Sequence, residues 1–481
     1  MGSTFHVEHF GCRAARADGE AVSDCLRSAG LSEEHPSAAD VVVVNTCSVT
    51  AEADRAARAF IRRAHRLNPQ ARIVVTGCYA QRAPHELAAM PGVAAVVGNS
   101  HKALAPGIIA GLSQSLPLTL PSAQPLVTLQ SIAAPASLAP IWADDRFAHS
   151  FLEEAQLIPG QQTRPNLKIQ EGCGNRCSFC VIPQTRGSSR SLPATSVLRQ
   201  VEGFVAAGGN ELVLSGINLG RWGRDLAPGT EGLTPRTLAA LVLQILHQTA
   251  LPRLRLSSIE PMDWDGELIA LMAEFGGTRL ARHAHLPLQS GSDAVLRRMH
   301  RRYRPWHYID KVHALLRAAG PDLTLGADVM AGFPGETDAE FEETEALIRS
   351  LPFGYLHLFP FSPRPGTKAE ALHADRPVPA RIVEERILAL RALAAEKSQA
   401  HRSRFLGREV EAITLHTSAE LASRGRTSAI TENFLPLEIE GQLPPNRLVR
   451  VRVIELNTGG ALTAELGLTN PRQYEATTIS V

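Results

Sequence analysis

The chain has 481 residues, 44% of them hydrophobic and 20% charged, and at roughly 100–200 residues per domain this length suits two to four domains. Its ordinary composition excludes a wholly disordered chain, a collagen-like fibre and a coiled coil. A formal net charge of +1 gives no support for a nucleic-acid partner, although a local basic patch is compatible with it. Because no apolar run reaches the roughly 18 residues of a membrane helix and no secretory signal is visible, we expect a cytoplasmic protein with no membrane partner.

The first part of the chain alternates strand and helix patterns. The runs 41–44 and 71–75 predict buried strands, and residues 51–67 between them predict a helix. Strand–helix–strand order with short connections indicates a parallel sheet covered by helices, which we assign to residues 1–110. The next stretch has no charged residue from 103 to 143, so we interpret residues 111–160 as a linker or insertion, with a buried segment as the alternative.

Strand and helix patterns resume at residue 161 and continue to residue 404. Six strands separated by helical patterns indicate a partial parallel (βα)6 barrel. The strand patterns are 166–169, 211–214, 254–256, 283–286, 324–327 and 355–358, and a long charged helix is expected over 376–404.

The C-terminal residues 405–481 predict only short strands, at 409–415, 435–439, 448–456 and 461–466. They indicate a small all-β module. The fold class expected for the chain is therefore α/β, with an N-terminal parallel-sheet domain, a central partial barrel and a small C-terminal all-β domain.

The sharpest local signal is a group of three cysteines, Cys173, Cys177 and Cys180, directly after a predicted strand. A tight loop of this kind can bring three sulfurs around one inorganic centre. Zinc and structural iron–sulfur sites usually have four protein ligands, whereas a four-iron cluster held by three cysteines leaves one iron open. A zinc site completed by a distant histidine is the alternative reading.

A second group consists of Cys12, Cys47 and Cys78, each of which follows an apolar stretch. The ends of successive parallel strands share one edge of a sheet, so these three side chains can converge on one centre. The alternative is that they are ordinary buried cysteines. Cys25 falls inside a helical pattern, and we interpret it as a packing residue.

Seven stretches together resemble the radical S-adenosylmethionine methylthiotransferase family, across almost the whole chain. Their joint occurrence in this order is specific, although each string alone is weak. The stretches are NTCSVTAEADR (45–55), TGCYAQR (76–82), EGCGNRCSFCVIPQTRG (171–187), SSIEP (257–261), LPLQSGSD (286–293), GADVMAGFPGET (326–337) and PFSPRPGT (360–367).

The resemblance implies two 4Fe–4S clusters, an auxiliary cluster in the first domain and a radical cluster in the barrel, with S-adenosylmethionine on the open iron of the latter. One electron from the radical cluster would cleave the sulfonium bond and release a 5′-deoxyadenosyl radical. It also implies that the C-terminal module is an RNA-binding TRAM domain. The residues expected to frame S-adenosylmethionine are Phe179, Gly216, Ser258, Glu260, Gln289 and Asp328.

Family resemblance further implies a tRNA partner, a flavodoxin-like or ferredoxin-like electron donor and a sulfur source. The strings at 45–58 and 356–367 look most like enzymes that add a methylthio group at C2 of N6-threonylcarbamoyladenosine at position 37. The same-fold alternative is the isopentenyladenosine enzyme. An alternative of another class is a non-catalytic iron–sulfur redox sensor that binds RNA.

Three groups of arginines are candidates for tRNA phosphate contacts. Solvated charged faces are the plainer reading of each. Tyr303 and Trp306, beside the second group, could stack on bases. The groups are Arg55, Arg58, Arg62 and Arg66; Arg297, Arg298, Arg301, Arg302 and Arg304; and Arg424, Arg426, Arg447, Arg450 and Arg452.

Overall fold

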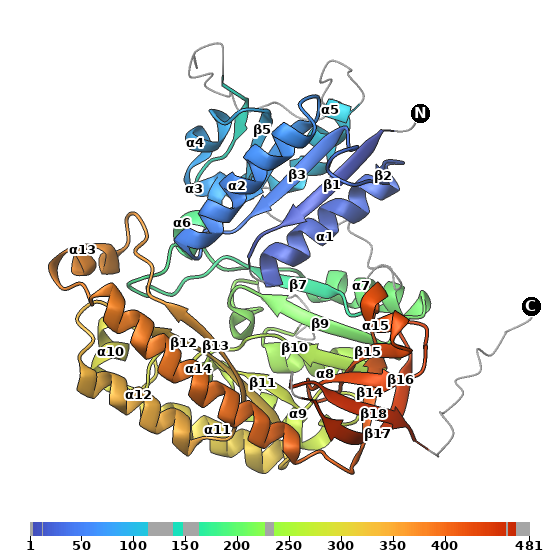
Figure 1. Ribbon diagram of the computed structural model, residues 1–481, viewed down its shortest axis with the longest axis vertical. Helices are drawn as coiled ribbons and strands as arrows, with labels where there is room; N and C mark the ends of the chain where they lie inside the picture. Colours follow the sequence, from blue (N-terminus) through green and yellow to red (C-terminus); the bar gives the residue numbers. More distant parts are fainter. Residues whose placement is uncertain are drawn as a thin grey trace, which may run out of the picture.

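A computed structural model describes residues 3–11, 13–113, 138–147, 163–226, 235–457 and 460–467. Figure 1 shows an N-terminal α/β domain above a central barrel, with a small β-barrel packed at the side of the central one. Within the described ranges, no helix combines the length and apolar character needed to cross a membrane. The expected mixed α/β fold is confirmed.

The N-terminal domain contains one parallel sheet with strand order β2-β1-β3-β4-β5-β6. Both of its faces are covered, because alternate residues of β3 belong to different cores: Val42 and Val44 pack with α2, and Val41 and Val43 pack with α1 and α5. Burial on both faces explains the uninterrupted valine run. The strands are β1 (Thr4–His9), β2 (Ser32–Glu33), β3 (Val41–Thr46), β4 (Arg72–Gly77), β5 (Val93–Gly98) and β6 (Ile141–Trp142).

The helices of this domain follow from local signals. The helix α2 begins after Thr50, whose side-chain oxygen accepts a hydrogen bond from the Ala53 amide at 3.2 Å. Glu52 and Asp54 in its first turn complement the helix dipole. The helices are α1 (Arg13–Ser28), α2 (Ala51–Leu67), α3 (Cys78–Arg82), α4 (Pro84–Ala88), η1 (Asn99–Leu104) and α5 (Ala105–Ser113).

Part of the charge-poor stretch belongs to this domain. The helix α5 packs on the sheet, and β6 pairs in parallel with β5 through Val96–Ile141 and Val97–Trp142. The alternative of a buried segment therefore applies to these pieces. Residues 114–137 and 148–162 lie outside the described ranges, so the limits of the insertion at 111–160 stay a prediction.

The central part has six parallel strands that follow one another in chain order. One sheet contains β10-β9-β7 with a short antiparallel β8 (Arg190–Ser191), and a second contains β11-β12-β13. Isolated bridges, Leu254–Leu280 and Ser258–His285, connect the two sheets. The parallel strands are β7 (Asn166–Glu171), β9 (Glu211–Gly216), β10 (Arg253–Leu256), β11 (His283–His285), β12 (Thr324–Ala331) and β13 (Phe353–Pro360).

Helices cover the outer face of this partial barrel (Figure 1). The short helix α6 (Ile182–Arg186) follows the cysteine loop, and α14 (Ala380–Ser403) carries most of the expected charged stretch. The others are α7 (Ala194–Ala206), α8 (Leu238–Gln248), α9 (Gly266–Phe275), α10 (Asp293–Arg298), α11 (Pro305–Ala319), α12 (Asp338–Ser350) and α13 (Lys368–Asp375), with η2 (Leu219–Arg221) and η3 (Pro261–Asp263) in the loops.

The C-terminal module is a closed barrel with strand order β14-β15-β16-β18-β17. The strand β15 was not expected, because its polar and small side chains give no strand signal. The strands are β14 (Glu409–Thr414), β15 (Arg426–Thr431), β16 (Pro436–Glu440), β17 (Leu448–Leu456) and β18 (Leu462–Leu466), with α15 (Ala419–Ser423) between the first two.

This module packs against the amino-terminal ends of the central strands. Glu432 accepts from Arg282 at 2.8 Å, and Glu411 forms an ion pair with Arg253 at the start of β10. The ring of Phe434 lies 4.5 Å from that of His283 at the start of β11. The C-terminal barrel therefore lies at the edge of the central barrel opposite to the cysteine loop.

The N-terminal domain lies at the other edge. Arg364, in the loop after β13, donates to the Val49 carbonyl at 3.3 Å and pairs with Asp54 at 2.7 Å. The Ala51 amide donates to Ser362 Oγ at 3.2 Å. The loops that follow the strands of the N-terminal sheet and of the central barrel thus face each other. Cys47, Cys78 and the three barrel cysteines lie where these strands end.

Candidate cluster and cofactor site

The three cysteines of the central barrel line one cavity of ≈ 210 Å³ beyond the end of β7. Five of the six residues expected to frame S-adenosylmethionine line the same cavity: Phe179, Ser258, Glu260, Gln289 and Asp328. They come from loops and strands between residues 179 and 328. The barrel topology therefore brings together residues that are far apart in the sequence.

Gly216 is the exception, since it is not among the residues that line the cavity. A Cβ atom at this position would lie 2.8 Å from Gln170 Cβ, so glycine permits the close approach of β9 to β7. The next two residues, Ile217 and Asn218, line the cavity in its place.

Hydrogen-bond donors surround the sulfur atoms. The backbone nitrogen of Asn175 lies 3.4 Å from Cys173 Sγ, and the side-chain Nδ2 of Asn218 lies 3.6 Å from the same atom. Arg301 Nη1 lies 3.6 Å from Cys177 Sγ. Donors of this kind stabilise sulfur in its anionic form, as a cluster ligand requires.

Arg301 also anchors a carboxylate in the cavity. Its Nη1 donates to Glu260 Oε1 at 2.7 Å, and Asn175 Nδ2 donates to the same oxygen at 3.0 Å. In the sequence, Arg301 belongs to a basic cluster that we interpreted as a tRNA contact or a solvated face, and Asn175 and Asn218 carry no motif that marks them. Their positions could have marked them, because Asn175 lies within the cysteine loop and Asn218 follows the barrel strand β9.

Burial raises the pKa of the Cys180 thiol to about 12 and raises the pKa of Cys173 and Cys177 as well. These sulfurs therefore become thiolates at neutral pH only with a positively charged partner such as iron. The donor set fits a metal cluster for this reason.

The spacing of the sulfurs separates a cluster from a single zinc ion. Thiolates around one tetrahedral zinc lie roughly 3.8 Å apart, given Zn–S bonds of about 2.3 Å. Histidine, cysteine, aspartate and glutamate side chains can all bind a metal ion. Within the described part of the chain, only His285, Asp328 and His357 form a group of three or more of these residues whose ligand atoms all lie within 4.8 Å of one another. The three cysteine sulfurs are not all within 4.8 Å of one another, which suits a multi-iron cluster better than one zinc ion.

Polar atoms without partners point to a polar ligand in the cavity. Gln289 Oε1 and Asn218 Oδ1 are buried and accept no hydrogen bond from the described residues. Gln289 also has a φ of 64°, a conformation that non-glycine residues rarely adopt. A ligand with hydrogen-bond donors would satisfy both oxygens, as S-adenosylmethionine can.

Asp328 is held in place by two histidines. Its Oδ1 lies 3.4 Å from His285 Nε2 and 3.3 Å from His357 Nδ1. Burial opposes ionisation of this carboxyl, but the contacts with both histidines outweigh it and hold the pKa of Asp328 below its usual value. The cavity therefore contains a fixed negative charge at this point.

The second group of cysteines follows adjacent strands. Cys47 and Cys78 come directly after the paired ends of β3 and β4, and both are buried. Gly11 lies against Cys47, since a Cβ atom on it would be 2.5 Å from Cys47 Sγ. Cys12 itself lies outside the described residues, and Cys25 lies on α1.

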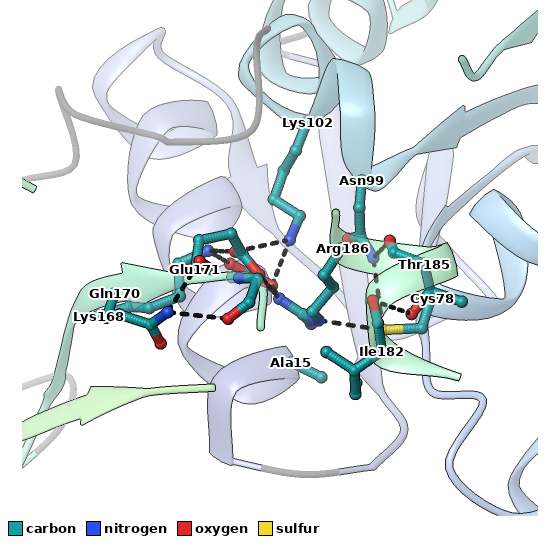
Figure 2. A network of polar contacts seen from close by, with 12 residues as sticks. Ala15, Cys78, Asn99, Lys102, Lys168, Gln170, Glu171, Ile182, Thr185 and Arg186 are labelled. Carbon is teal, nitrogen blue, oxygen red and sulfur yellow. Dashed lines mark hydrogen bonds and ion pairs between the residues drawn. The ribbon is translucent and has the colours of Figure 1, made fainter. Parts of the chain in front are cut away.

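The sulfur of Cys78 accepts two hydrogen bonds. Asn99 Nδ2 donates to it at 3.3 Å, and Arg186 Nε donates at 3.1 Å (Figure 2). Arg186 belongs to α6 of the central barrel, so this contact crosses from one domain to the other. The sequence analysis did not single out either donor, although Arg186 lies within one of the quoted family stretches.

The family model described as "Uncharacterized protein family UPF0004" matches residues 4–98, and the Radical SAM superfamily model matches residues 167–348. The chain is 33% identical to threonylcarbamoyladenosine tRNA methylthiotransferase MtaB of Bacillus subtilis, over 94% of this chain and 93% of that one. It is also 33% identical to MtaB of Aquifex aeolicus, over 93% and 99%. The chain belongs to the radical S-adenosylmethionine methylthiotransferase family.

Another methylthiotransferase, the tRNA-2-methylthio-N(6)-dimethylallyladenosine synthase of Erythrobacter litoralis, is 33% identical over 86% of this chain and 87% of that one. Among solved structures, the radical S-adenosylmethionine methyltransferase TsrM of Kitasatospora setae covers 78% of each chain with a TM-score of 0.50 and 14% identity. At this identity the likeness concerns the fold alone. Two 4Fe–4S clusters and S-adenosylmethionine are the cofactors of this methylthiotransferase, as the sequence indicates.

The structure changes the reading of the second basic group in this methylthiotransferase. Tyr303 is fully buried and donates to the Pro287 carbonyl at 2.7 Å, so its expected stacking on a base is wrong. Arg298 pairs with Glu340 at 2.7 Å, and Arg301 faces the cavity. The exposed members are Arg297, which pairs with Asp293 at 2.8 Å, Arg302 and Trp306.

Proposed function

We propose that this methylthiotransferase adds a methylthio group to C2 of N6-threonylcarbamoyladenosine at position 37 of tRNA. The observation that carries the proposal is its likeness to MtaB enzymes over nearly their whole length, 93% and 99% in the two cases above. The dimethylallyladenosine synthases match at equal identity but over 85–87% of their length. The isopentenyladenosine substrate is therefore the second choice.

Cys173, Cys177 and Cys180 would hold the radical cluster in this proposal. When bound, that cluster and S-adenosylmethionine supply the one-electron chemistry that generates a carbon radical. The chain's own contribution is orientation: Gln289 and Asn218 offer buried acceptor oxygens, and the Glu260–Arg301 pair and Asp328 supply fixed charges in the cavity. Phe179, 5.7 Å from the Arg301 guanidinium, supplies an apolar wall.

Cys12, Cys47 and Cys78 would hold the auxiliary cluster, which supplies or carries sulfur. The support is that Cys47 and Cys78 end adjacent strands and that Gly11 lies against Cys47. Since the loops after both sheets face each other, a nucleoside bound between the domains would reach both centres.

The tRNA would be gripped by exposed arginines. Arg55, Arg62 and Arg66 are exposed on α2, whereas Arg58 of the same face pairs with Glu86. In the C-terminal barrel, Arg450 and Arg452 alternate on β17 and point to one face. A tRNA substrate also predicts a cytoplasmic location, a flavodoxin-like or ferredoxin-like electron donor and a sulfur source.

The substrate is tested by incubating the reconstituted enzyme with three tRNA preparations: unmodified, isopentenylated and threonylcarbamoylated. Mass spectrometry of the nucleosides should find a methylthio product only with the threonylcarbamoylated tRNA. Cys177→Ala serves as the control without a functional radical cluster. A product only on isopentenylated tRNA would assign the chain to the alternative substrate.

The redox-sensor alternative is tested with the same enzyme. An enzyme of the proposed class releases 5′-deoxyadenosine from S-adenosylmethionine when it is reduced with dithionite, whereas a sensor does not. The absence of 5′-deoxyadenosine from a chain that contains both clusters would favour the sensor.

A further inference from the structure

A buried network of charged side chains connects the N-terminal domain to the central barrel (Figure 2). Asp18 on α1 forms ion pairs with Lys102 and Lys168, and Arg186 Nη1 lies 3.1 Å from Asp18 and 2.6 Å from Glu171. Lys168 also pairs with Glu171. The side chains of all five residues are at least nine-tenths buried.

The network contains three cations and two carboxylates, so it has one excess positive charge. The next charged groups outward, Arg190 and Asp225, have opposite signs and leave this balance unchanged. An isolated charge in a dry interior is costly, and buried charges are therefore paired. The acceptor that remains beside this excess charge is the sulfur of Cys78, to which Arg186 Nε donates at 3.1 Å. The negative charge of a cluster ligand at Cys78 would balance the network.

The same arginine links the two groups of cysteines. Its Nε donates to Cys78 Sγ, its Nη1 donates to Glu171 Oε1, and that oxygen accepts from the Gly172 amide at 3.3 Å. Cys173 is the next residue, and its amide donates to the Gly187 carbonyl, beside Arg186, at 3.0 Å. Hydrogen bonds therefore connect Cys78 through Arg186 and Glu171 to Gly172, which is joined to Cys173 by a peptide bond.

We propose that Arg186 is a positioning residue of the auxiliary cluster, one that compensates the charge of the Cys78 thiolate and fixes it relative to the Cys173 loop. The inference rests on the proposed function in one respect, since it takes Cys78 as a cluster ligand. Asn99, the second donor to this sulfur, supports the same geometry without charge.

The test is an EPR-monitored redox titration of the auxiliary cluster in a chain whose Cys173, Cys177 and Cys180 are replaced by alanine. Positive charge and hydrogen bonds to cluster sulfur favour the reduced state. Arg186→Gln should therefore move the midpoint potential to a more negative value. Arg186→Lys keeps the charge and should restore part of the shift, and Asn99→Ala should give a smaller shift in the same direction.

In the otherwise unaltered enzyme, Arg186→Gln should lower the ratio of methylthio product to 5′-deoxyadenosine several-fold. The matched control is Arg253→Gln, because Arg253 is equally buried and pairs with two carboxylates, Glu211 and Glu411, but contacts no sulfur. It should lower thermal stability and leave the potential of the auxiliary cluster unchanged.

An unchanged potential and EPR spectrum in Arg186→Gln would overturn the role of Arg186 while leaving the proposed function intact. If that variant does not fold, unchanged potentials in both Arg186→Lys and Asn99→Ala would have the same meaning. A parent chain that binds no cluster at Cys47 and Cys78 would instead overturn the proposed function.

Discussion

Gly11 lies against Cys47, one of the three cysteines proposed to hold the auxiliary cluster. Its φ is +109°, and a side chain there would collide with Cys47. We expect Gly11→Ala to displace Cys47 and to lower the iron content from about eight atoms per chain, the sum for two four-iron clusters, to about four. Iron analysis after anaerobic reconstitution measures this.

The control is Gly30→Ala, which has a φ of +86° but nothing within 4 Å of an added Cβ. It carries the same backbone strain without the collision, so its iron content should stay near that of the parent. Equal iron contents in both variants would show that Gly11 has no such role.

Replacing the cysteines separates the two centres. Cys47→Ala or Cys78→Ala should abolish methylthiolation and leave part of the reductive cleavage of S-adenosylmethionine, since the radical cluster is untouched. Cys177→Ala should abolish both activities, and Cys25→Ala should retain both. Product assays by mass spectrometry give the answer, and normal thiolation by the Cys78→Ala enzyme would remove the auxiliary site from the mechanism.

At the residue scale, the sequence predicted which residues share a cavity better than it predicted the contacts of the sulfur atoms. The three barrel cysteines and five of the residues expected around them line one cavity, and each lies in a recognisable motif. Arg186 and Arg301 were missed as sulfur contacts because their partners, Cys78 and Cys177, are more than one hundred positions away. Such contacts depend on how the domains pack, which no local pattern contains.

At the scale of single elements, the end of α14 contains a histidine that makes stability depend on pH. Burial, with Arg404 and Arg402 nearby and only Asp322 opposing them, lowers the pKa of His401 to about 4 from an ordinary 6.5. Thr324 Oγ1 lies 2.8 Å from its Nε2. The unfolded chain binds this proton more readily than the folded one. The contribution of neutral His401 to the free energy of unfolding is therefore fully present above pH 6.5 and is lost as the pH falls towards 4.

The change amounts to at most about 3 kcal/mol over this window. His401→Gln should flatten the decline, so that its melting temperature falls less than that of the parent between pH 7.5 and 5. The exposed His313 on α11 offers the control, and His313→Gln should follow the parent curve. Parallel curves for His401→Gln and the parent would contradict the assignment.

Most elements were predictable because their patterns are strong. The six barrel strands were located from their strand patterns and α2 from its helical pattern, and α2 has its expected limits. The strand β15 was missed, since Arg-Thr-Ser-Ala-Ile-Thr is stabilised by its neighbours β14 and β16 rather than by its own apolar content. The strand β6 has only two residues and depends on pairing with β5.

At the scale of the whole molecule, tRNA binding can be tested at the C-terminal barrel. Arg447, Arg450 and Arg452 are exposed and form no ion pair with the described residues. Replacing all three with glutamine should weaken tRNA binding and reduce the slope of log K against log salt by up to about 2. Filter binding at several salt concentrations measures this slope.

The control replaces Arg424 and Arg426 with glutamine. These two arginines pair with Glu420 and Glu438, respectively, each at 2.7 Å. Arginines already neutralised in this way should contribute less to the slope. Equal losses in the two variants would show that the face of β17 is not special. Deleting the module is a poorer test, since deletion would expose the buried Arg255 and Glu211 in the central barrel.

The loop that carries Phe434 has a consequence for how such enzymes can evolve. Its ring lies 5.3 Å from the Arg255 guanidinium and 5.5 Å from the Tyr355 ring, and the neighbouring Glu432 binds Arg282. The C-terminal barrel therefore completes the base of the catalytic barrel and is not a detachable attachment. Recombination that exchanged this barrel between relatives would need to bring matching partners for residues 432 and 434, so the two parts should be inherited together.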